Sequence, residues 1–123
     1  MDPRHTKRLR TVQNLYAQVY QPKTGKKQKL PYVGDNVTKK VLENLEEIDK
    51  NIKKHAPRYP LEKIAPIDIS ILRLAIFELL FDKSQPIKVI INEAVELARE
   101  LGNERSYAFV NAVLGSINLD KNK

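Results

Sequence analysis

Apolar residues recur at intervals of three and four along most of the chain, and no stretch alternates as a β-strand would. Over residues 4–20 the apolar stripe consists of Leu9, Val12, Tyr16 and Val19, which predicts an amphipathic helix. The same spacing predicts helices over 36–55, 61–65 and 67–82, a helix that follows Pro86, and a last helix after Asn103. The chain is therefore predicted to be all-α.

The segment 67–82 is apolar on almost every side of its predicted helix. Asp68, Arg73 and Glu78 interrupt the run, and these charges argue against a membrane span. A helix that is hydrophobic all round is normally surrounded by other helices. We therefore expect 67–82 to be the central helix of the fold.

Capping signals mark the ends of these helices. Asp35 is placed as the N-cap of the 36–55 helix, and Pro57 ends that helix. Gly102 is placed as a C-terminal cap and Asn103 as the N-cap of the last helix. Residues 21–35 are polar, rich in lysine and contain two prolines, so they are predicted to form a basic loop.

Composition narrows the class of protein. With 41% hydrophobic and 30% charged residues, the 123-residue chain is predicted to be one soluble globular domain, 1–123. The absence of cysteine excludes disulfides and thiolate metal sites. No apolar segment of the kind found in signal peptides follows the charged N-terminus, so we expect a cytoplasmic location.

The net charge of +7 is concentrated at one end of the chain. Residues 1–40 hold ten Lys or Arg against two acidic residues, whereas residues 41–123 hold twelve against thirteen. Four of the cations share the first predicted helix, which favours binding to nucleic acid: Arg4, Lys7, Arg8 and Arg10. The lysines at 23–29 fit either a polyanion contact or simple solubility.

No arrangement typical of an active site is visible. His5 and His55 lie far apart in sequence, so both are expected to be surface histidines rather than metal ligands. The four glycines are isolated, which excludes a glycine-rich phosphate loop. Glu93, Glu96 and Glu100 are interpreted as a solvated helix face. We therefore predict a protein that is not an enzyme and has no cofactor and no metal.

The string ELARELGNERSYAFV raises the alternative of a DNA-binding helix-turn-helix. That motif needs buried residues at the position after Gly102 and at the sixth and ninth positions after it. These positions hold Asn103, Ala108 and Asn111, which disfavours the motif. Asn92 and Asn111 are interpreted instead as partners in a polar contact between the last two helices.

Several longer strings resemble the NusB family of bacterial transcription antitermination factors. They are TVQNLY (11–16), ILRLAIFELL (71–80), PIKVIINEAVELARELG (86–102) and SYAFVNAVL (106–114). The resemblance is dense over 62–118 and weak over 21–60, where a helix of the family is reduced or missing. It implies an all-α fold of two small helical sub-bundles around the central apolar helix.

The resemblance also implies a function and its residues. It implies binding of single-stranded boxA-type RNA together with NusE, a ribosomal protein, within the transcription elongation complex. The implied RNA-binding residues are Arg4, Lys7, Arg8, Arg10, Ile87, Lys88 and Phe109, and the implied partner-binding residues are Tyr16, Tyr20, Glu62 and Asp68. The chain departs from the family pattern at Ala108 and Ala112. Members of the family commonly carry a basic residue at the position of Ala108, and Arg105 is expected to supply that positive charge here.

Two rival interpretations remain besides the DNA-binding one. In the first, the chain is a helical protein-interaction module without specific RNA binding. In the second, it is an accessory domain of the kind that precedes some RNA methyltransferases. The salt dependence of RNA affinity separates RNA binding from the first rival, because phosphate contacts release counterions. The preferred RNA sequence, the choice between monomer and homodimer, and the choice between antitermination and ribosome assembly are left open.

Overall fold

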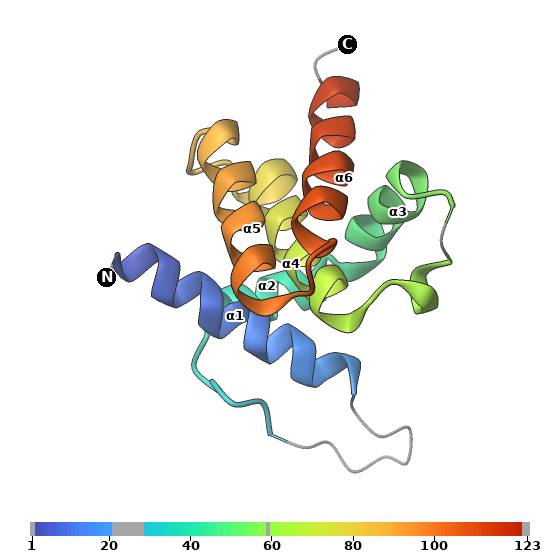
Figure 1. Cartoon of the computed structure of the whole chain (residues 1–123). Helices are drawn as coiled ribbons and strands as arrows, with labels where there is room; N and C mark the ends of the chain where they lie inside the picture. Colours follow the sequence, from blue (N-terminus) through green and yellow to red (C-terminus); the bar gives the residue numbers. More distant parts are fainter. Residues whose placement is uncertain (1, 21–28, 59, 122–123) are drawn as a thin grey trace.

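The computed structural model describes residues 2–20, 29–58 and 60–121, and every regular element in this part of the chain is helical (Figure 1). The elements are α1 (Pro3–Val19), α2 (Asn36–Glu43), α3 (Leu45–His55), the 3₁₀-helix η1 (Leu61–Lys63), α4 (Pro66–Phe77), the π-helical turn η2 (Glu78–Asp82), α5 (Ile87–Leu101) and α6 (Ser106–Lys121). The all-α prediction is confirmed.

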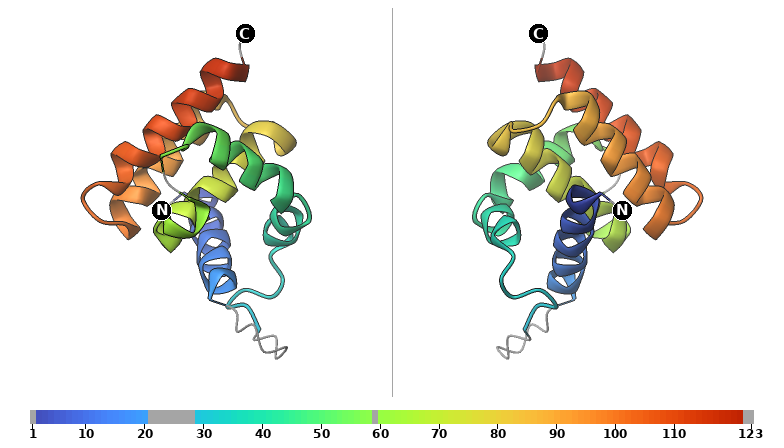
Figure 2. Two further views of the ribbon diagram at one scale, coloured as in Figure 1. Left: turned by 90° about the vertical axis from the view of Figure 1, so that its right-hand side faces the viewer. Right: turned by 90° about the vertical axis from the view of Figure 1, so that its left-hand side faces the viewer.

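Helix α4 is the centre of the fold and contacts all five other α-helices. Nine of its twelve residues are buried, as expected for a helix enclosed on every side. Figure 2 shows α2 and α3 on one side of α4, α5 and α6 on the other, and α1 running beneath. The prediction of a central apolar helix between two helical groups is confirmed.

The prediction of one helix over 36–55 is wrong, because the chain bends at Asn44. This residue has φ −109° and ψ 15°, and its side-chain amide donates to the Lys40 carbonyl oxygen at 2.8 Å. Asparagine side chains compete in this way with the backbone ladder of a helix. The bend lets Val41 on α2 and Ile48 on α3 both reach the core, where each is fully buried.

The central helix is also shorter than predicted, since its last turn widens into η2. The Lys83 amide donates to the Glu78 carbonyl at 2.9 Å, and Lys83 takes the left-handed conformation with φ 56°. In this wider turn Leu79 stays buried while Phe81 is 39% exposed. The regular part of the helix therefore ends earlier than the apolar pattern indicated.

The turn between α5 and α6 depends on Gly102, which caps α5 as predicted. A Cβ atom at this position would overlap the Ser106 hydroxyl and lie 2.8 Å from the Ala98 carbonyl oxygen. Asn103 caps the turn rather than α6 itself, because its side-chain oxygen accepts from the Arg105 amide at 2.8 Å. The Asn103 amide in turn donates to the Ser106 hydroxyl at 3.0 Å, and α6 begins only at Ser106.

Two negative findings concern the described ranges 2–20, 29–58 and 60–121. None of their helices is both long enough and apolar enough to cross a membrane. Within the same ranges, no three His, Cys, Asp or Glu side chains are grouped so that they could hold a metal ion.

Candidate nucleic-acid interface

Helix α1 presents part of its positive charge to solvent. Asp2 caps the helix by accepting from the Arg4 amide at 3.0 Å. Arg4, Lys7 and Arg10 are exposed, whereas Arg8 is only 8% exposed. The four cations that the sequence placed in one group therefore occupy two different environments.

Arg8 is held by carboxylates of two other helical segments. Its Nε lies 3.1 Å from both carboxylate oxygens of Glu78, and its nearest terminal nitrogen is 3.9 Å from Glu93. Burial raises the pKa of the Glu78 carboxyl, and the adjacent Arg8 guanidinium opposes that rise. This ion pair fixes α1 against the rest of the fold, and the predicted RNA contact of Arg8 stays a prediction.

His5 is not the surface histidine that the sequence suggested. Its Nδ1 lies 3.0 Å from Glu93, and its Nε2 lies 3.1 Å from the Glu100 carboxylate. The hydrogen bond to Glu93 raises the pKa of His5, partial burial opposes this rise, and Glu100 adds to it. Glu93 and Glu100 are thus contacts of α1. The interpretation as a solvated face is wrong for Glu93, which is half-buried, whereas Glu96 and Glu100 are exposed as expected.

The raised pKa of His5 predicts a pH-dependent stability. Imidazolium is favoured in the folded state, so this stabilisation is complete below the unfolded pKa of about 6.5 and is lost as the pH rises through the folded pKa. We expect the free energy of unfolding to fall over this window, by no more than about 1 kcal/mol. Urea denaturation at a series of pH values measures the change.

The variant His5→Gln should remove most of this pH dependence. Glu96→Gln is the matched control, because Glu96 is also on α5 but is 61% exposed and lies beside Arg99 rather than His5. An unchanged pH profile in His5→Gln would contradict the assignment.

His55 is likewise tied into the structure rather than free on the surface. Its side chain is 7% exposed, its Nδ1 lies 2.8 Å from the Ser116 hydroxyl, and its Nε2 lies 3.5 Å from Asp120. These contacts join α3 to α6. The expectation of two surface histidines is therefore wrong for both.

The predicted polar contact between the last two helices is absent from the described residues. Asn92 and Asn111 are both exposed, and no hydrogen bond joins them in that part of the chain. Asn92 instead lines a hollow with Asn118 at the start of α5. Glu93, beside it in sequence, is the residue that makes an inter-helix contact, and this contact is with α1.

A second feature of α1 is its contact with the segment before α2. The Arg10 guanidinium lies over the Tyr32 ring, 5.5 Å from its centroid. The fully buried Asn14 fixes the Tyr32 backbone, donating to its carbonyl at 2.9 Å and accepting from its amide at 2.8 Å. This arrangement borders a cavity of about 470 Å³ lined by Lys7, Arg10, Tyr32, Gly34, Asp35, Asn36 and Val37.

Sequence reasoning did not identify Asn14 or Tyr32 as parts of this surface. The only signal for Asn14 was a polar residue between Val12 and Leu15, two positions that are fully buried. Asp35 is confirmed as the N-cap of α2, accepting from the Thr38 amide at 3.2 Å. It also accepts from the Thr11 hydroxyl of α1 at 2.6 Å, which holds this region against α1.

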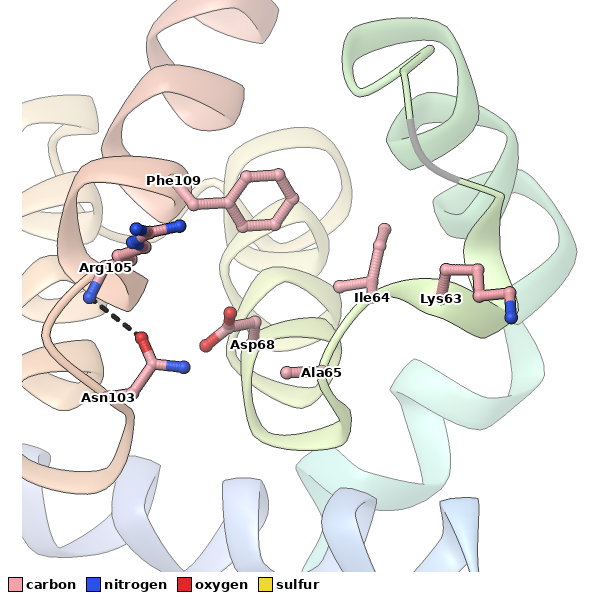
Figure 3. Close-up of a pocket in the computed structure, with 7 residues that line it drawn as sticks. All are labelled: Lys63, Ile64, Ala65, Asp68, Asn103, Arg105 and Phe109. Carbon is pink, nitrogen blue, oxygen red and sulfur yellow. Dashed lines mark hydrogen bonds between the residues drawn. The ribbon is translucent and has the colours of Figure 1, made fainter.

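A cavity of about 180 Å³ lies between η1, the start of α4 and the start of α6 (Figure 3). It brings together Arg105 and Phe109, predicted to bind RNA, and Asp68, predicted to bind the protein partner. The Phe109 ring is partly buried and packs against the core as well as lining the cavity. The full lining is Lys63, Ile64, Ala65, Asp68, Asn103, Arg105 and Phe109.

Asp68 is almost enclosed, with 7% of its surface exposed. Its Oδ1 has no hydrogen-bond partner among the described residues. Burial raises the pKa of the Asp68 carboxyl, and a hydrogen bond with the Ser106 side chain opposes this rise. Asp68 is thus a buried acceptor facing a cavity, which its apolar-helix sequence context did not indicate.

The remaining predicted residues lie outside these two cavities. Ile87 and Lys88 line the hollow at the start of α5, with Lys88 exposed and Ile87 packed against the core. Tyr16 and Tyr20 are 40% and 58% exposed, and their ring centroids are 5.1 Å apart. Glu62 is exposed on η1.

Of the lysines at 23–29, only Lys29 is among the described residues, and it is exposed. Lys23, Lys26 and Lys27 lie outside the described residues. Their predicted contribution to a polyanion contact therefore stays a prediction.

The helix-turn-helix alternative does not fit the packing of α5 and α6. The three positions that this motif requires to be buried are Asn103, Ala108 and Asn111, and all three are exposed. The turn between the helices is therefore not that of a DNA-reading motif.

The fold and the surface define a small all-helical domain, built round one buried helix, with a basic first helix. The model of the NusB family matches residues 5–118, and the chain belongs to this family. This match confirms the resemblance of the sequence strings.

Named relatives agree with this membership. The transcription antitermination protein NusB of Bacillus licheniformis is 45% identical over 80 residues, and that of Dehalococcoides mccartyi is 43% identical over 81 residues. These matches cover 65% and 66% of this chain but 62% and 57% of the relatives' own lengths. A solved structure of T. maritima NusB (P3121, form 2) is 31% identical with a TM-score of 0.79, covering 94% of this chain and 90% of that one.

Proposed function

We propose that this chain is an RNA-binding antitermination factor that binds single-stranded boxA-type RNA together with NusE. The observation that carries the proposal is the exposure of Arg4, Lys7 and Arg10 on one helix. Phosphate contacts by such cations supply salt-dependent affinity that is largely independent of sequence. Family membership supplies the link to antitermination.

Sequence preference needs contacts to bases as well as to phosphates. Unstacked bases of single-stranded RNA stack on aromatic side chains of the protein and form hydrogen bonds along the base edges. Phe109 lines a cavity with Arg105, and Tyr32 lies under Arg10, so an aromatic ring accompanies the cations in both places. Ile87 and Lys88 at the start of α5 complete the proposed RNA-binding set.

The proposed surface for NusE is centred on the two exposed tyrosines of α1. Tyr16 borders an apolar cavity of about 310 Å³ together with Pro66, Ile67 and Leu101. Exposed aromatic side chains beside an apolar hollow are typical anchors of protein interfaces. Glu62 would lie at the edge of this surface, and the assembled complex would act on transcripts during elongation, in the cytoplasm.

Fluorescence anisotropy tests the proposal with a short boxA-like RNA and a scrambled control, at two salt concentrations, with and without NusE. We expect tighter binding to the boxA-like RNA, a further gain with NusE, and a loss of about tenfold in Phe109→Ala. Tyr107→Ala is the matched control, because Tyr107 is 41% exposed, does not line the cavity, and has its ring covered by Arg99.

A contrary result would be equal and weak binding to both RNAs, with no effect of NusE. It would favour the interaction-module interpretation, in which the basic helix only increases solubility. The exposed Tyr16–Tyr20 pair would then be the main functional surface.

A further inference from the structure

We propose that the surface beside Tyr32 is a further RNA subsite, in which one unstacked base stacks on the Tyr32 ring while Lys7 and Arg10 hold the adjoining phosphates. The inference rests on the proposed RNA-binding function and adds a base contact to it. Tyr32 lies within 21–60, outside the strings that resemble the NusB family. The subsite would take one nucleotide of the bound strand whatever its base, because every base has a face that can stack.

The Tyr32 ring takes little part in the packing of the core. It is 38% exposed and is not among the side chains that pack against the hydrophobic core. Its backbone is nevertheless fixed, because the fully buried Asn14 side chain donates to the Tyr32 carbonyl at 2.9 Å and accepts from the Tyr32 amide at 2.8 Å. The Asp35 amide donates to the same carbonyl at 3.2 Å. An exposed ring on a fixed backbone loses little freedom when a base stacks on it, which favours binding.

Two cations border this ring. The Arg10 guanidinium lies over Tyr32, 5.5 Å from the ring centroid, and Lys7 lines the same cavity. Both cations are exposed, and neither forms an ion pair among the described residues. Asp35 is the one carboxylate among the described residues that line the cavity, and it accepts from the Thr11 hydroxyl at 2.6 Å and caps α2. The excess of positive charge favours a phosphate over a cationic side chain of another protein.

The cavity beside Tyr32 is large enough for a nucleotide and is continuous with the exposed cations of α1. Its volume of about 470 Å³ is within the roughly 300–1,000 Å³ typical of sites for small ligands. A second hollow of about 150 Å³ adjoins it, since Lys7 and Val37 line both, and this hollow reaches Arg4. Arg4 and Arg10 are separated by about 9 Å along the helix axis. An RNA strand that follows these cations along α1 would therefore reach Tyr32.

This cavity lies on the other side of α1 from the surface proposed for NusE. Lys7 and Tyr16 are separated by about two and a half helical turns, so their side chains leave α1 on opposite faces. Tyr16 borders the start of α4 and the end of α5, whereas Lys7 borders the segment before α2 and its first turn. Figure 2 shows α2 and α5 on different sides of the central helix. RNA at Tyr32 and NusE at Tyr16 can therefore be bound at the same time.

The test uses short single-stranded boxA-like RNAs in which one nucleotide at a time is replaced by an abasic nucleotide. We expect Tyr32→Ala to bind the intact RNA about tenfold more weakly than the wild-type protein does. At one position, an abasic nucleotide should cost the wild-type protein about tenfold in affinity and Tyr32→Ala nothing further. Tyr32→Phe keeps the aromatic ring and should behave as the wild-type protein. Fluorescence anisotropy measures each affinity.

A matched control and a second variant make the result specific. Tyr107→Ala is the control, because Tyr107 is 41% exposed and has Arg99 4.7 Å from its ring centroid, but lies on α6 and does not line the cavity. It should keep the wild-type response at every abasic position. Circular dichroism melting confirms that each variant is folded. Tyr32→Leu, which removes the aromatic face but keeps an apolar side chain, takes the place of Tyr32→Ala should that variant fail to fold.

The salt dependence of binding distinguishes a stacking residue from one that only positions Arg10. A lost stack removes no phosphate contact, so the slope of log affinity against log salt should be the same in Tyr32→Ala and in the wild-type protein. If Tyr32→Ala instead weakens intact and abasic RNAs alike and lowers the slope, Tyr32 acts only through Arg10 and the subsite is refuted.

The remaining outcomes separate the subsite from the proposed function. If RNA binding is salt-dependent but Tyr32→Ala keeps the wild-type response at every abasic position, the subsite is refuted and RNA binding stands. If Tyr32→Ala weakens NusE binding in the absence of RNA and leaves RNA binding unchanged, the surface belongs to a protein partner and the inference is overturned. If the wild-type protein binds no RNA, both proposals fail together.

Discussion

Replacing Glu78 with alanine is expected to lower the free energy of unfolding by about 3 kcal/mol, because it leaves the Arg8 guanidinium buried without its main partner. The side chains of Arg8 and Glu78 are 9% and 13% exposed, and their nearest charged atoms are 3.1 Å apart. Glu93 is 3.9 Å from Arg8 and compensates only in part. Urea denaturation followed by circular dichroism measures the change.

A double variant separates the destabilisation caused by an unpaired buried charge from the net contribution of the ion pair to the free energy of unfolding. Arg8→Met combined with Glu78→Leu should recover most of the stability, because apolar residues of similar volume often replace a buried ion pair without cost. Glu96→Ala is the matched control on α5, and with a side chain 61% exposed it should change stability by less than about 0.5 kcal/mol. Equal destabilisation in Glu78→Ala and Glu96→Ala would show that the buried pair is not what holds α1.

Replacing Arg4, Lys7 and Arg10 together with glutamine is expected to weaken binding to single-stranded RNA by about a hundredfold at low salt. Each phosphate contact to a single strand contributes about 0.7 to the slope of log affinity against log salt, so the slope should fall by about 2. All three side chains are exposed, and none forms an ion pair among the described residues. Anisotropy titrations over a range of salt concentrations measure both quantities.

The matched control carries the same change of charge on other helices. Lys39, Lys50 and Lys53 lie on α2 and α3, and all three are exposed. Replacing these three with glutamine should reduce the slope by much less. A similar reduction in both triple variants would mean that RNA responds to net charge alone, not to the α1 surface.

Local patterns predicted most of the helices, and the exceptions have local causes. The spacing of Leu9, Val12 and Tyr16 located α1 within a residue or so at each end. The same spacing continued across Asn44, where a side-chain hydrogen bond to the backbone ends α2. Apolar periodicity indicates only which face of a helix is buried. Because α2 and α3 both bury their apolar faces in the same core, the bend between them does not interrupt the periodicity.

The sequence by itself determined the all-α class, the central position of the 67–82 segment, and the concentration of cations on the first helix. These properties follow from the helical repeat and from composition, which are set by residues close together in the chain. The tertiary structure alone decided which of these charges are exposed. Arg8 meets Glu78 across 70 residues and His5 meets Glu93 across 88, and only the packing of α1 against the other helices brings such residues together.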